Sequence, residues 1–318
     1  MKNYIIQGYC HDPYANLAME ERLFERFGAH GAALYLWQNA HTVVIGKNQN
    51  AWSQCRLEAL IAEGGKLARR TTGGGAVYHD LGNLNFSIIL PKQDYDLMRQ
   101  LGVVLAALAA FGLKGEFVGR NDLLLNGCKF SGSAFRFDRM RALHHGTLLV
   151  DVNMDRLSRY LTVDAGKLRD KGIESVRSRV CNLKHACPAL NVESLRMELA
   201  QAFENEYGKA VMLEEEQLKD AQYLALCERN ASSRWLYGDN PSFTHGIQKR
   251  FAWGQVELCL QVEAGCIENA VLYTDAMDVF EGLAEALVGC PYQSKAVAAR
   301  LMPYSQELAA WVEEEIKV

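Results

Sequence analysis

Three consecutive glycines, Gly73-Gly74-Gly75, constrain this chain more than any other feature. Glycine has no Cβ, so its backbone can adopt positive φ and come close to a ligand. Arg69 and Arg70 precede the run, and arginine binds phosphate or carboxylate through a rigid fork of donors. Exposed backbone N–H groups in such a loop form an anion-binding nest. We therefore expect a loop that wraps an anionic substrate, with Arg70 as its clamp. A glycine-rich turn flanked by solvated arginines is the alternative.

The known phosphate-binding loops do not match this stretch. A Walker loop has Gly-Lys-Ser/Thr after its glycines, whereas Ala76-Val77-Tyr78 follows here. The dinucleotide-binding fingerprint has a further glycine where Tyr78 stands. A nucleotide at this loop would therefore be held in another way.

Length and composition narrow the class of protein. A chain of 318 residues has room for one large domain and a small one, and 49% hydrophobic residues suffice for a core. The net charge of −4 gives no sign of a nucleic-acid-binding surface. The longest apolar stretch, residues 101–113, is too short to span a bilayer and predicts a core helix, so we expect no membrane segment.

The nine cysteines form neither a disulfide framework nor a Cys-x-x-Cys pair, which argues against zinc and dithiol chemistry. Residues 1–10 lack the charged and apolar regions of a signal peptide. Scattered thiols without an export signal predict the reducing cytoplasm as the location of the protein.

A strand is expected over residues 83–90, where polar and apolar side chains alternate. Asn83, Asn85 and Ser87 would share one face. A polar face is costly in a core and useful in a binding site.

Asn126-Gly127 predicts a type I′ hairpin turn. If the turn consists of those two residues, Asp122 pairs with Ser131 across the hairpin. Asp122, Lys129, Ser131 and Ser133 are then expected to project from one side. A lysine among short polar side chains on a sheet face suggests a site, and an exposed hairpin with a solvated lysine is the alternative.

His144 and His145 are adjacent on a further predicted strand and should point to opposite faces, which makes joint ligation of one metal difficult. One of them can line a site, and a structural histidine is the alternative. A basic segment at residues 167–179 is interpreted either as a solvated loop or as a docking surface for an acidic partner.

The remaining pattern predicts an α+β chain in two parts. Asp12-Pro13 should open a helix, since Asp12 can cap it and proline fits the first turn. A composition change at residues 238–241 indicates a linker. We expect a catalytic domain at 1–243 and a small accessory domain at 244–318, with two strands followed by helices.

Three motifs together resemble lipoate-protein ligase A: RRxxGGGAVYHDxGNxNxS at residues 69–87, GRNDLxxxxxKxSGSAxR from 119, and HHGTLL from 144, supported by residues 167–183. The resemblance covers most of the chain. It implies a fold like biotin ligases and class II tRNA synthetases, with mixed, largely antiparallel sheets, packed helices and a small α+β accessory domain. The implied enzyme activates lipoate with ATP to lipoyl-AMP. It then transfers the lipoyl group to a lysine of lipoyl-carrier domains, in the E2 subunits of 2-oxoacid dehydrogenases and in the glycine cleavage H protein.

The resemblance also implies roles for individual residues. Lys129 matches the catalytic lysine that contacts lipoate and nucleotide. The implied ATP-binding and site-lining positions are Arg70, Gly73, Gly74, Gly75, Ala76, Val77, Tyr78, Asn83, Asp122, His145 and Thr147.

Adenylate formation brings two anions together, so Lys129, Mg²⁺ and the loop N–H groups are expected to screen the charge. Asp122 is a candidate both to orient Lys129 and to hold Mg²⁺. Val77 and Phe86 are candidates for the apolar wall around the lipoyl tail.

Three alternatives remain open. An ATP-independent octanoyl or lipoyl transferase of the same fold would use a cysteine nucleophile. Cys128 should face away from Lys129, and Cys181 lies beyond the motif region. A non-catalytic binder of lipoyl groups or nucleotides would not need the intact Lys129. A biotin ligase would carry a glycine-arginine-rich signature that is absent here.

Overall fold

The computed structural model describes residues 2–27, 31–119, 121–162, 180–237, 245–263, 265–277 and 280–316. The chain divides into two compact units. The N-terminal unit comprises Met1–Ile45, Ala51–Thr72 and Ala76–Leu236, and the C-terminal unit comprises Gly46–Asn50, Gly73–Gly75 and Tyr237–Val318. The expected boundary at 243/244 falls within residues 238–244, outside the described part of the chain.

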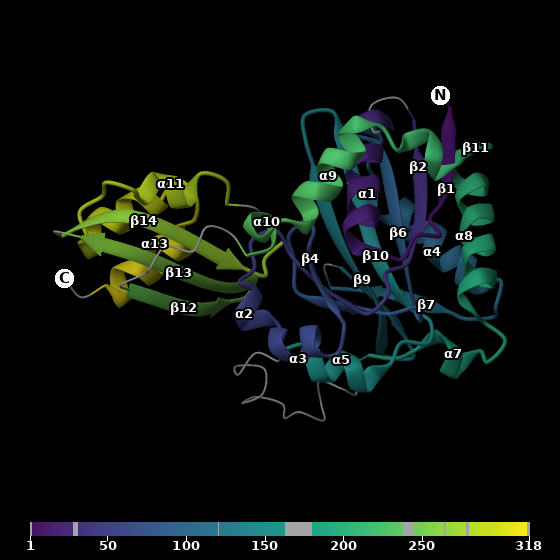
Figure 1. Cartoon of the computed structure of the whole chain (residues 1–318), viewed down its shortest axis with the longest axis horizontal. Coiled ribbons are helices and arrows are strands. Elements are labelled where there is room, and N and C mark those ends of the chain that lie inside the picture. Colours follow the sequence, from purple (N-terminus) through teal and green to yellow (C-terminus); the bar gives the residue numbers. More distant parts are fainter. Residues whose placement is uncertain are drawn as a thin grey trace. The chain divides into compact units, whose positions relative to one another are not determined.

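The N-terminal unit is built on a large mixed sheet with the strand order β11-β1-β2-β6-β10-β9-β8-β7 (Figure 1). Strand β1 pairs in parallel with β2 and β11, and the other neighbours pair antiparallel. The strands are β1 (Asn3–Gln7), β2 (Ala33–Trp37), β6 (Asn83–Pro91), β7 (Gly115–Val118), β8 (Asp122–Leu125), β9 (Cys128–Phe137), β10 (Arg141–Leu149) and β11 (Ala210–Leu213). The expected mixed, largely antiparallel α+β architecture is confirmed.

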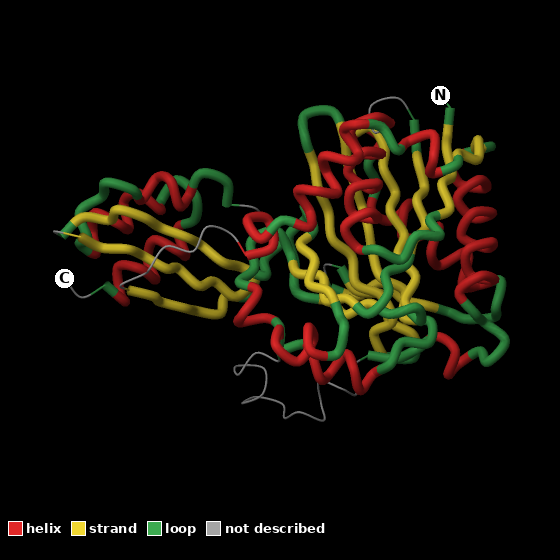
Figure 2. Tube along the Cα trace, in the orientation of Figure 1, coloured by secondary structure: helices red, strands yellow, loops and turns green. Residues whose placement is uncertain are grey.

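Helices cover both faces of this sheet, as Figure 2 shows in red beside the yellow strands. Helix α1 (Pro13–Phe27) packs with α9 (Ala221–Ala231) on one face, around Leu17, Leu23 and Phe24. Helix α4 (Leu97–Ala109) packs with α8 (Val192–Tyr207) on the other face, in a larger apolar core. We call these the α1 face and the α4 face of the sheet.

Helix α1 begins where the sequence predicts. Asp12 Oδ1 accepts hydrogen bonds from the N–H groups of Tyr14 (2.9 Å) and Ala15 (3.2 Å), which satisfies two of the free donors at the helix start. Glu20 and Glu21 lie on the buried side of this helix. The apolar stripe of α1 therefore carries two carboxylates toward the sheet.

A small sheet, β4-β3-β5, completes the N-terminal unit. Its strands are β3 (Thr42–Ile45), β4 (Lys66–Arg69) and β5 (Val77–His79). Shorter elements lie between these strands and helices along the chain: α2 (Ala51–Gln54), α3 (Leu57–Ala62), η1 (Lys92–Asp94), α5 (Met154–Tyr160), α7 (Leu183–Ala186), η2 (Glu215–Leu218) and α10 (Ser233–Tyr237).

The β8–β9 hairpin has the expected turn but not the expected register. Asn126 (φ 51°) and Gly127 (φ 80°) both have positive φ, as a type I′ turn requires. Strand β9 carries one extra residue beyond the turn, so Leu123 pairs with Ser131, and Asp122 pairs with Gly132. The predicted pairing of Asp122 with Ser131 is wrong, because a β-bulge shifts the alternation by one residue.

The C-terminal unit is a three-stranded antiparallel sheet of β12 (His245–Phe251), β13 (Gly254–Glu263) and β14 (Cys266–Thr274). Helices α11 (Leu283–Leu287), α12 (Ser294–Leu301) and α13 (Gln306–Glu315) complete its core, in which Trp311 is fully buried. The sequence predicts β13, β14, α12 and α13 but misses β12, whose pattern lacks strict alternation.

Two short loops from the first third of the chain belong to this C-terminal unit. Thr274 N donates to Asn48 O (2.7 Å), and Gly74 N donates to Ala276 O (2.9 Å). A Cβ on Gly73 would lie 2.6 Å from Ala276 O, so only glycine fits there. The close approach that glycine permits is made here to the protein's own backbone.

Some predictions fall on residues that the structure does not describe. These are the basic segment 167–179 and the linker at 238–241. Within the described residues, no helix combines the length and hydrophobicity needed to cross a membrane.

Candidate active site

Strand β6 has the predicted polar face, and this face looks toward α1. Asn83, Asn85 and Ser87 are all buried, and Asn83 Nδ2 donates to Asn85 Oδ1 (3.0 Å). Asn83 Oδ1 is buried without a hydrogen-bond partner in the described structure. Phe86 lies on the α4 face, in the apolar core, so the prediction that it lines the lipoyl pocket is wrong by strand alternation.

Lys129 and Asp122 form an ion pair on the hairpin. The Lys129 ammonium lies 2.7 Å from Asp122 Oδ1, and each side chain is about one-third exposed (34% and 35%). They share one side of the sheet, as predicted, because Lys129 pairs with Leu124 and Asp122 is the alternate residue on the same strand. Ser133 is turned to the α4 face, where its Oγ lies 2.9 Å from His144 Nε2, so its predicted position beside Lys129 is wrong.

Lys129 lies across the α1 face toward β10. A Cβ built on Gly132 would lie 3.0 Å from the Lys129 ammonium nitrogen. The N–H of Gly132 donates to Thr147 Oγ1 (3.3 Å) on the neighbouring strand. Thr147 and His145 are alternate residues of β10 and therefore share this face. Lys129, Asp122, Thr147 and His145 thus lie on the same face of the sheet.

The two adjacent histidines point to opposite faces, as predicted. His144 is enclosed on the α4 face by Gln100 Oε1 (2.9 Å) and Ser133, and burial lowers the pKa of its imidazole to about 3. His145 lies on the α1 face, with Nδ1 2.7 Å from Glu20 Oε1 and Nε2 2.9 Å from Thr72 Oγ1. His145 is therefore the histidine of the site, and His144 belongs to the core.

Arg70 is buried beside His145. Its Nε donates to Thr72 Oγ1 (2.9 Å) and its Nη1 to Val44 O (3.3 Å). Burial lowers the pKa of Arg70 to about 10, while the Glu20 charge opposes the decrease, so the guanidinium stays charged at neutral pH. Arg69 instead donates to the carbonyl groups of Trp235 (2.8 Å) and Leu236 (2.6 Å) and ties β4 to α10. Of the two arginines, Arg70 is the one that shares the Thr72 hydroxyl with His145.

The residues after the glycines divide between two roles. Val77 is half-buried against the α1-face core. The Tyr78 side chain is buried away from the site, with its hydroxyl 2.9 Å from His41 Nδ1, so only its backbone is available to a ligand. His79 lies near Arg70 and His145, and burial, followed by these two neighbours, lowers its pKa to about 3. His79 is therefore a neutral group at the site that the sequence did not single out.

The glycines themselves lie in the C-terminal unit. Because Gly74 N donates to Ala276 O, an anion that bound this N–H would have to replace that hydrogen bond. Gly75 has open space where a Cβ would point, and it is exposed.

The described residues contain no cluster of three or more His, Cys, Asp or Glu side chains suited to a metal ion. Asp122 is paired with the Lys129 ammonium rather than with another carboxylate. Magnesium that arrives on phosphate oxygens needs only one or two protein carboxylates, so Asp122 fits that mode of binding and does not fit an all-protein magnesium site.

One further residue at the site, Glu20, escaped the sequence analysis. Glu20 is 2% exposed, and its Oε1 accepts from Ser87 Oγ (2.5 Å) and lies 2.7 Å from His145 Nδ1. The available signal was its position on the buried stripe of α1, between Leu17 and Phe24. Cys181, which the transferase alternative considered, donates its N–H to Lys129 O (2.8 Å), but its side chain packs against the α4-face core.

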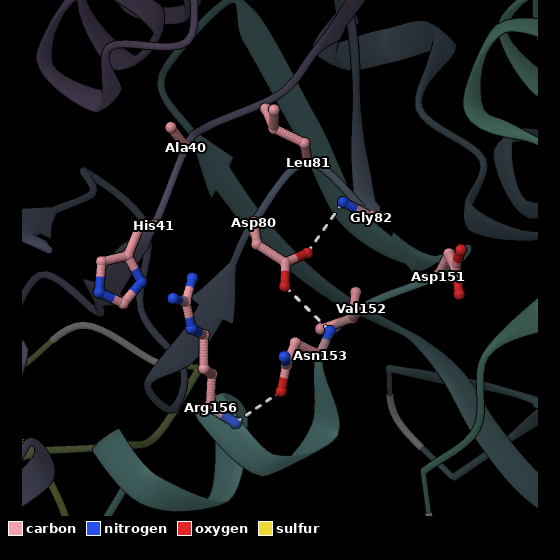
Figure 3. Close-up of a pocket in the computed structure, with 9 residues that line it drawn as sticks. All are labelled: Ala40, His41, Asp80, Leu81, Gly82, Asp151, Val152, Asn153 and Arg156. Carbon is pink, nitrogen blue, oxygen red and sulfur yellow. Dashed lines mark hydrogen bonds between the residues drawn. The ribbon is translucent and has the colours of Figure 1, made fainter. Parts of the chain in front are cut away.

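A separate polar pocket of about 610 Å³ lies at the β5–β6 turn (Figure 3). Asp80 accepts there from the N–H groups of Gly82 (2.8 Å) and Asn153 (2.9 Å), so its carboxylate is already satisfied by the turn and the start of α5. The other lining residues are Ala40, His41, Leu81, Asp151, Val152 and Arg156. None of the predicted site residues lines this pocket.

Comparison with known proteins agrees with the motifs. Residues 12–204 match the model of the lipoyl protein ligase A/B catalytic domain, and residues 240–317 match the bacterial lipoate protein ligase C-terminus. The chain belongs to the lipoate-protein ligase A family. A lipoate-protein ligase A from Bdellovibrio bacteriovorus is 43% identical over 305 residues, which cover 92% of this chain and 89% of the relative.

Solved structures of lipoate-protein ligases have the same fold. The P. falciparum LipL1 structure, determined in complex with lipoate, has a TM-score of 0.85 at 26% identity and covers 98% of this chain and 99% of that chain. The bipartite lipoate protein ligase from Thermoplasma acidophilum, studied with its E2 lipoyl domain, has a TM-score of 0.65 at 26% identity. It covers 77% of this chain and 100% of its own. In this lipoate-protein ligase fold, the charged groups of the candidate site are the Lys129–Asp122 ion pair, the Arg70 guanidinium and the Glu20 carboxylate.

Proposed function

We propose that this protein is an ATP-dependent lipoate-protein ligase, with a catalytic domain in residues 1–243 and an accessory domain in residues 244–318. The observation that carries the proposal is the Lys129–Asp122 ion pair, on the same sheet face as His145 and Thr147. A partly exposed ammonium that is held in place by a carboxylate can meet an anionic substrate without prior reorganisation.

In the first half-reaction, a carboxylate oxygen of lipoate attacks the α-phosphorus of ATP, the bond to the β-phosphate oxygen breaks, and pyrophosphate leaves. Both reactants are anionic, so cations must offset their repulsion. Lys129 supplies one positive charge and Arg70 supplies another, which is buried and retained at neutral pH. The predicted loop positions Gly73, Gly74, Gly75, Ala76, Val77 and Tyr78 would serve through their backbone groups, and Gly74 N–H would have to exchange its hydrogen bond to Ala276 O for one to the ligand.

Magnesium would enter on the phosphate oxygens of ATP, with Asp122 as the protein carboxylate that faces it. When bound, the ion withdraws electron density from the phosphates. Asp122 would also keep the Lys129 ammonium oriented, so the two roles that the sequence suggested for it are compatible.

In the second half-reaction, the amine of a carrier lysine attacks the carbonyl carbon of lipoyl-AMP, AMP leaves, and an amide forms. Adenylate is a good leaving group, so no nucleophile from the enzyme is needed. Lys129 can donate a hydrogen bond to the carbonyl oxygen as negative charge develops on it. The Asn83 Oδ1 atom, buried without a partner in the described structure, is available to a polar group of the ligand.

The proposed carriers are lipoyl domains of 2-oxoacid dehydrogenase E2 subunits and the glycine cleavage H protein. The archaeal relative that was studied with its E2 lipoyl domain supports the first of these. We also propose a cytoplasmic location, which suits the nine free thiols of the chain.

The proposal is tested by isotope exchange between pyrophosphate and ATP with the purified protein. Exchange should require lipoate, and a purified lipoyl domain added with ATP and lipoate should gain the mass of one lipoyl group. Absence of lipoate-dependent exchange in a folded preparation that still binds ATP would contradict the proposal. Octanoate in place of lipoate would define the acyl preference.

The ATP-independent transferase is the second candidate because a cysteine lies beside Lys129. Such an enzyme needs a thiolate. Burial, reinforced by the neighbouring Cys128 thiol, raises the pKa of Cys181 to about 11, which keeps this thiol protonated at neutral pH. A transferase would label the carrier from an acyl donor without ATP, and a ligase would not.

A further inference from the structure

Glu20 is a buried carboxylate for which the proposed mechanism has no use so far. It lies on α1 and is 2% exposed. A buried carboxylate is costly unless its oxygens are hydrogen-bonded and its charge is compensated. Ser87 Oγ lies 2.5 Å and His145 Nδ1 lies 2.7 Å from Glu20 Oε1. These contacts connect helix α1 to the polar faces of β6 and β10.

The contacts continue beyond Glu20 as a series of side-chain hydrogen bonds. Trp37 Nε1 donates to Ser87 Oγ (3.0 Å) at one end. His145 Nε2 lies 2.9 Å from Thr72 Oγ1, and Arg70 Nε donates to the same oxygen (2.9 Å) at the other end. Each of these side chains is less than one-tenth exposed. Arg70 is thus linked to Glu20 through two side chains in an interior where water does not compete.

The donors and acceptors of each group determine the direction of every hydrogen bond in this series. An ionised carboxylate only accepts, so Ser87 and the Nδ1–H of His145 must donate to Glu20. A neutral imidazole that is protonated on Nδ1 accepts on Nε2, so the Thr72 hydroxyl donates to it. The Thr72 oxygen then has lone pairs free to accept from Arg70. An imidazole protonated on Nε2 instead would leave its Nδ1 lone pair facing the carboxylate.

The charges of the group agree with this direction. Burial opposes ionisation of Glu20, but the His145 imidazole, its hydrogen bond, the Ser87 hydrogen bond and the Arg136 charge keep the pKa of this carboxyl below its ordinary value. The Arg70 guanidinium is charged, and His79 beside it is neutral because its pKa is about 3. One buried anion, Glu20, therefore lies in the same buried group as one buried cation, Arg70.

We propose that Glu20 is a positioning residue: it fixes His145 as the Nδ1–H tautomer, and through His145 and Thr72 it holds the Arg70 guanidinium in the orientation that receives the anionic substrate. The inference rests on the proposed ligase function for its catalytic consequence. Its structural part, the tautomer of His145, can be measured without any assay of activity. Outer-shell groups that orient metal ligands are worth about 10- to 100-fold, and we expect an effect of the same size from Glu20.

The tautomer is tested by NMR of the whole protein labelled with ¹⁵N-histidine. The chain has eight histidines, and the His145 signals are assigned by their loss in His145→Gln. Near neutral pH we expect a protonated Nδ1 and an unprotonated Nε2 in the wild type. The same pattern is expected in Glu20→Gln, whose amide oxygen can still accept, and it should be lost in Glu20→Leu. An Nε2–H tautomer in the wild type would overturn the inference, even if Glu20→Leu does not fold.

The matched control is Glu21→Gln. Glu21 is the neighbouring buried carboxylate of α1, but it pairs with Arg136 (3.2 Å) and Arg229 (2.5 Å), and among the described residues it has no hydrogen bond or ion pair with His145 or Thr72. This variant should leave the His145 tautomer unchanged.

Kinetics then separate positioning from folding. In Glu20→Leu, kcat of lipoate-dependent exchange should fall about 10- to 100-fold with a KM for ATP that changes by less than about threefold. Glu20→Gln should restore most of kcat. Unchanged kcat in folded Glu20→Leu would contradict the inference. Absence of exchange in the wild type, with the expected tautomer present, would contradict the proposed function and leave the positioning of His145 intact.

Discussion

The two faces of strands β9 and β10 are made from neighbouring residues but serve different purposes. On the α4 face, His144 is buried with the neutral partners Gln100 and Ser133 beside aromatic rings. On the α1 face, His145 is buried between a carboxylate and a hydroxyl that also holds Arg70. Burial alone therefore does not identify a functional histidine in this fold. The partners do: uncharged partners indicate packing, and charged partners indicate a site.

The largest difference between the faces is expected from substitution of the two histidines, in activity for His145 and in stability for His144. His145→Gln should reduce exchange activity about 10²-fold, because the group that orders Thr72 and Arg70 is lost, while its amide can still donate to Glu20. His144→Ala should lower the free energy of unfolding by about 2–4 kcal/mol, because it leaves a cavity and two polar groups without partners. Its folded fraction should keep nearly normal activity. Urea unfolding and exchange rates, measured on both variants, check this pair, and the reverse pattern would refute the comparison.

One glycine on each face allows a second comparison, in which substitution should affect activity on the α1 face and stability on the α4 face. A Cβ on Gly132 would lie 3.0 Å from the Lys129 ammonium nitrogen, and a Cβ on Gly146 would lie 2.6 Å from the Phe86 ring. Gly132→Ala should displace the flexible lysine and lower exchange about tenfold with little change in stability. Gly146→Ala should cost about 1–3 kcal/mol of stability through overpacking. Equal effects of the two substitutions on activity would show that the faces are not distinct.

Acid should lower the free energy of unfolding mainly because the buried neutral histidines become protonated when the chain unfolds. The pKa of His79 and of His144 is about 3 in the folded protein, below the ordinary value of 6.5. The unfolded chain therefore binds more protons between these values, and the stability falls as the pH decreases below 6.5. Each histidine should remove about 2 kcal/mol between pH 7 and pH 5. His144→Gln should halve the slope in urea titrations across this range, and an unchanged slope would mean that His144 is not buried in its neutral form.

The smallest effect on exchange activity is expected from substitution of the cysteines beside Lys129, because neither has a role in the proposed reaction. Because burial raises the pKa of Cys181 to about 11, its thiol should not act as a nucleophile. Cys128→Ser and Cys181→Ser should each change exchange by less than about twofold. Loss of carrier labelling in either variant would favour the transferase.

Local chemistry made much of the fold predictable. Asp12-Pro13 specifies a helix start, and Asn126-Gly127 specifies a turn, because a few neighbouring residues determine each backbone conformation. The polarity of β6 identified the α1 face, because alternation along a strand requires no knowledge of the partner strand.

The missed features depend on contacts between distant residues. The bulge in β9 has no glycine signature, yet it turns Ser133 from the expected face to the core. Glu20 resembles an ordinary helix residue until His145, 125 positions away, is placed beside it. The grouping of Gly73–Gly75 with the C-terminal unit depends on a hydrogen bond to Ala276 that no local pattern encodes.

The most direct test of the account is lipoate-dependent exchange between pyrophosphate and ATP in Lys129→Ala, with Lys92→Ala, an exposed lysine of η1, as the control. The account predicts that Lys129→Ala folds normally and loses about 10³-fold in exchange rate, and that Lys92→Ala matches the wild type. Normal exchange in folded Lys129→Ala would contradict it.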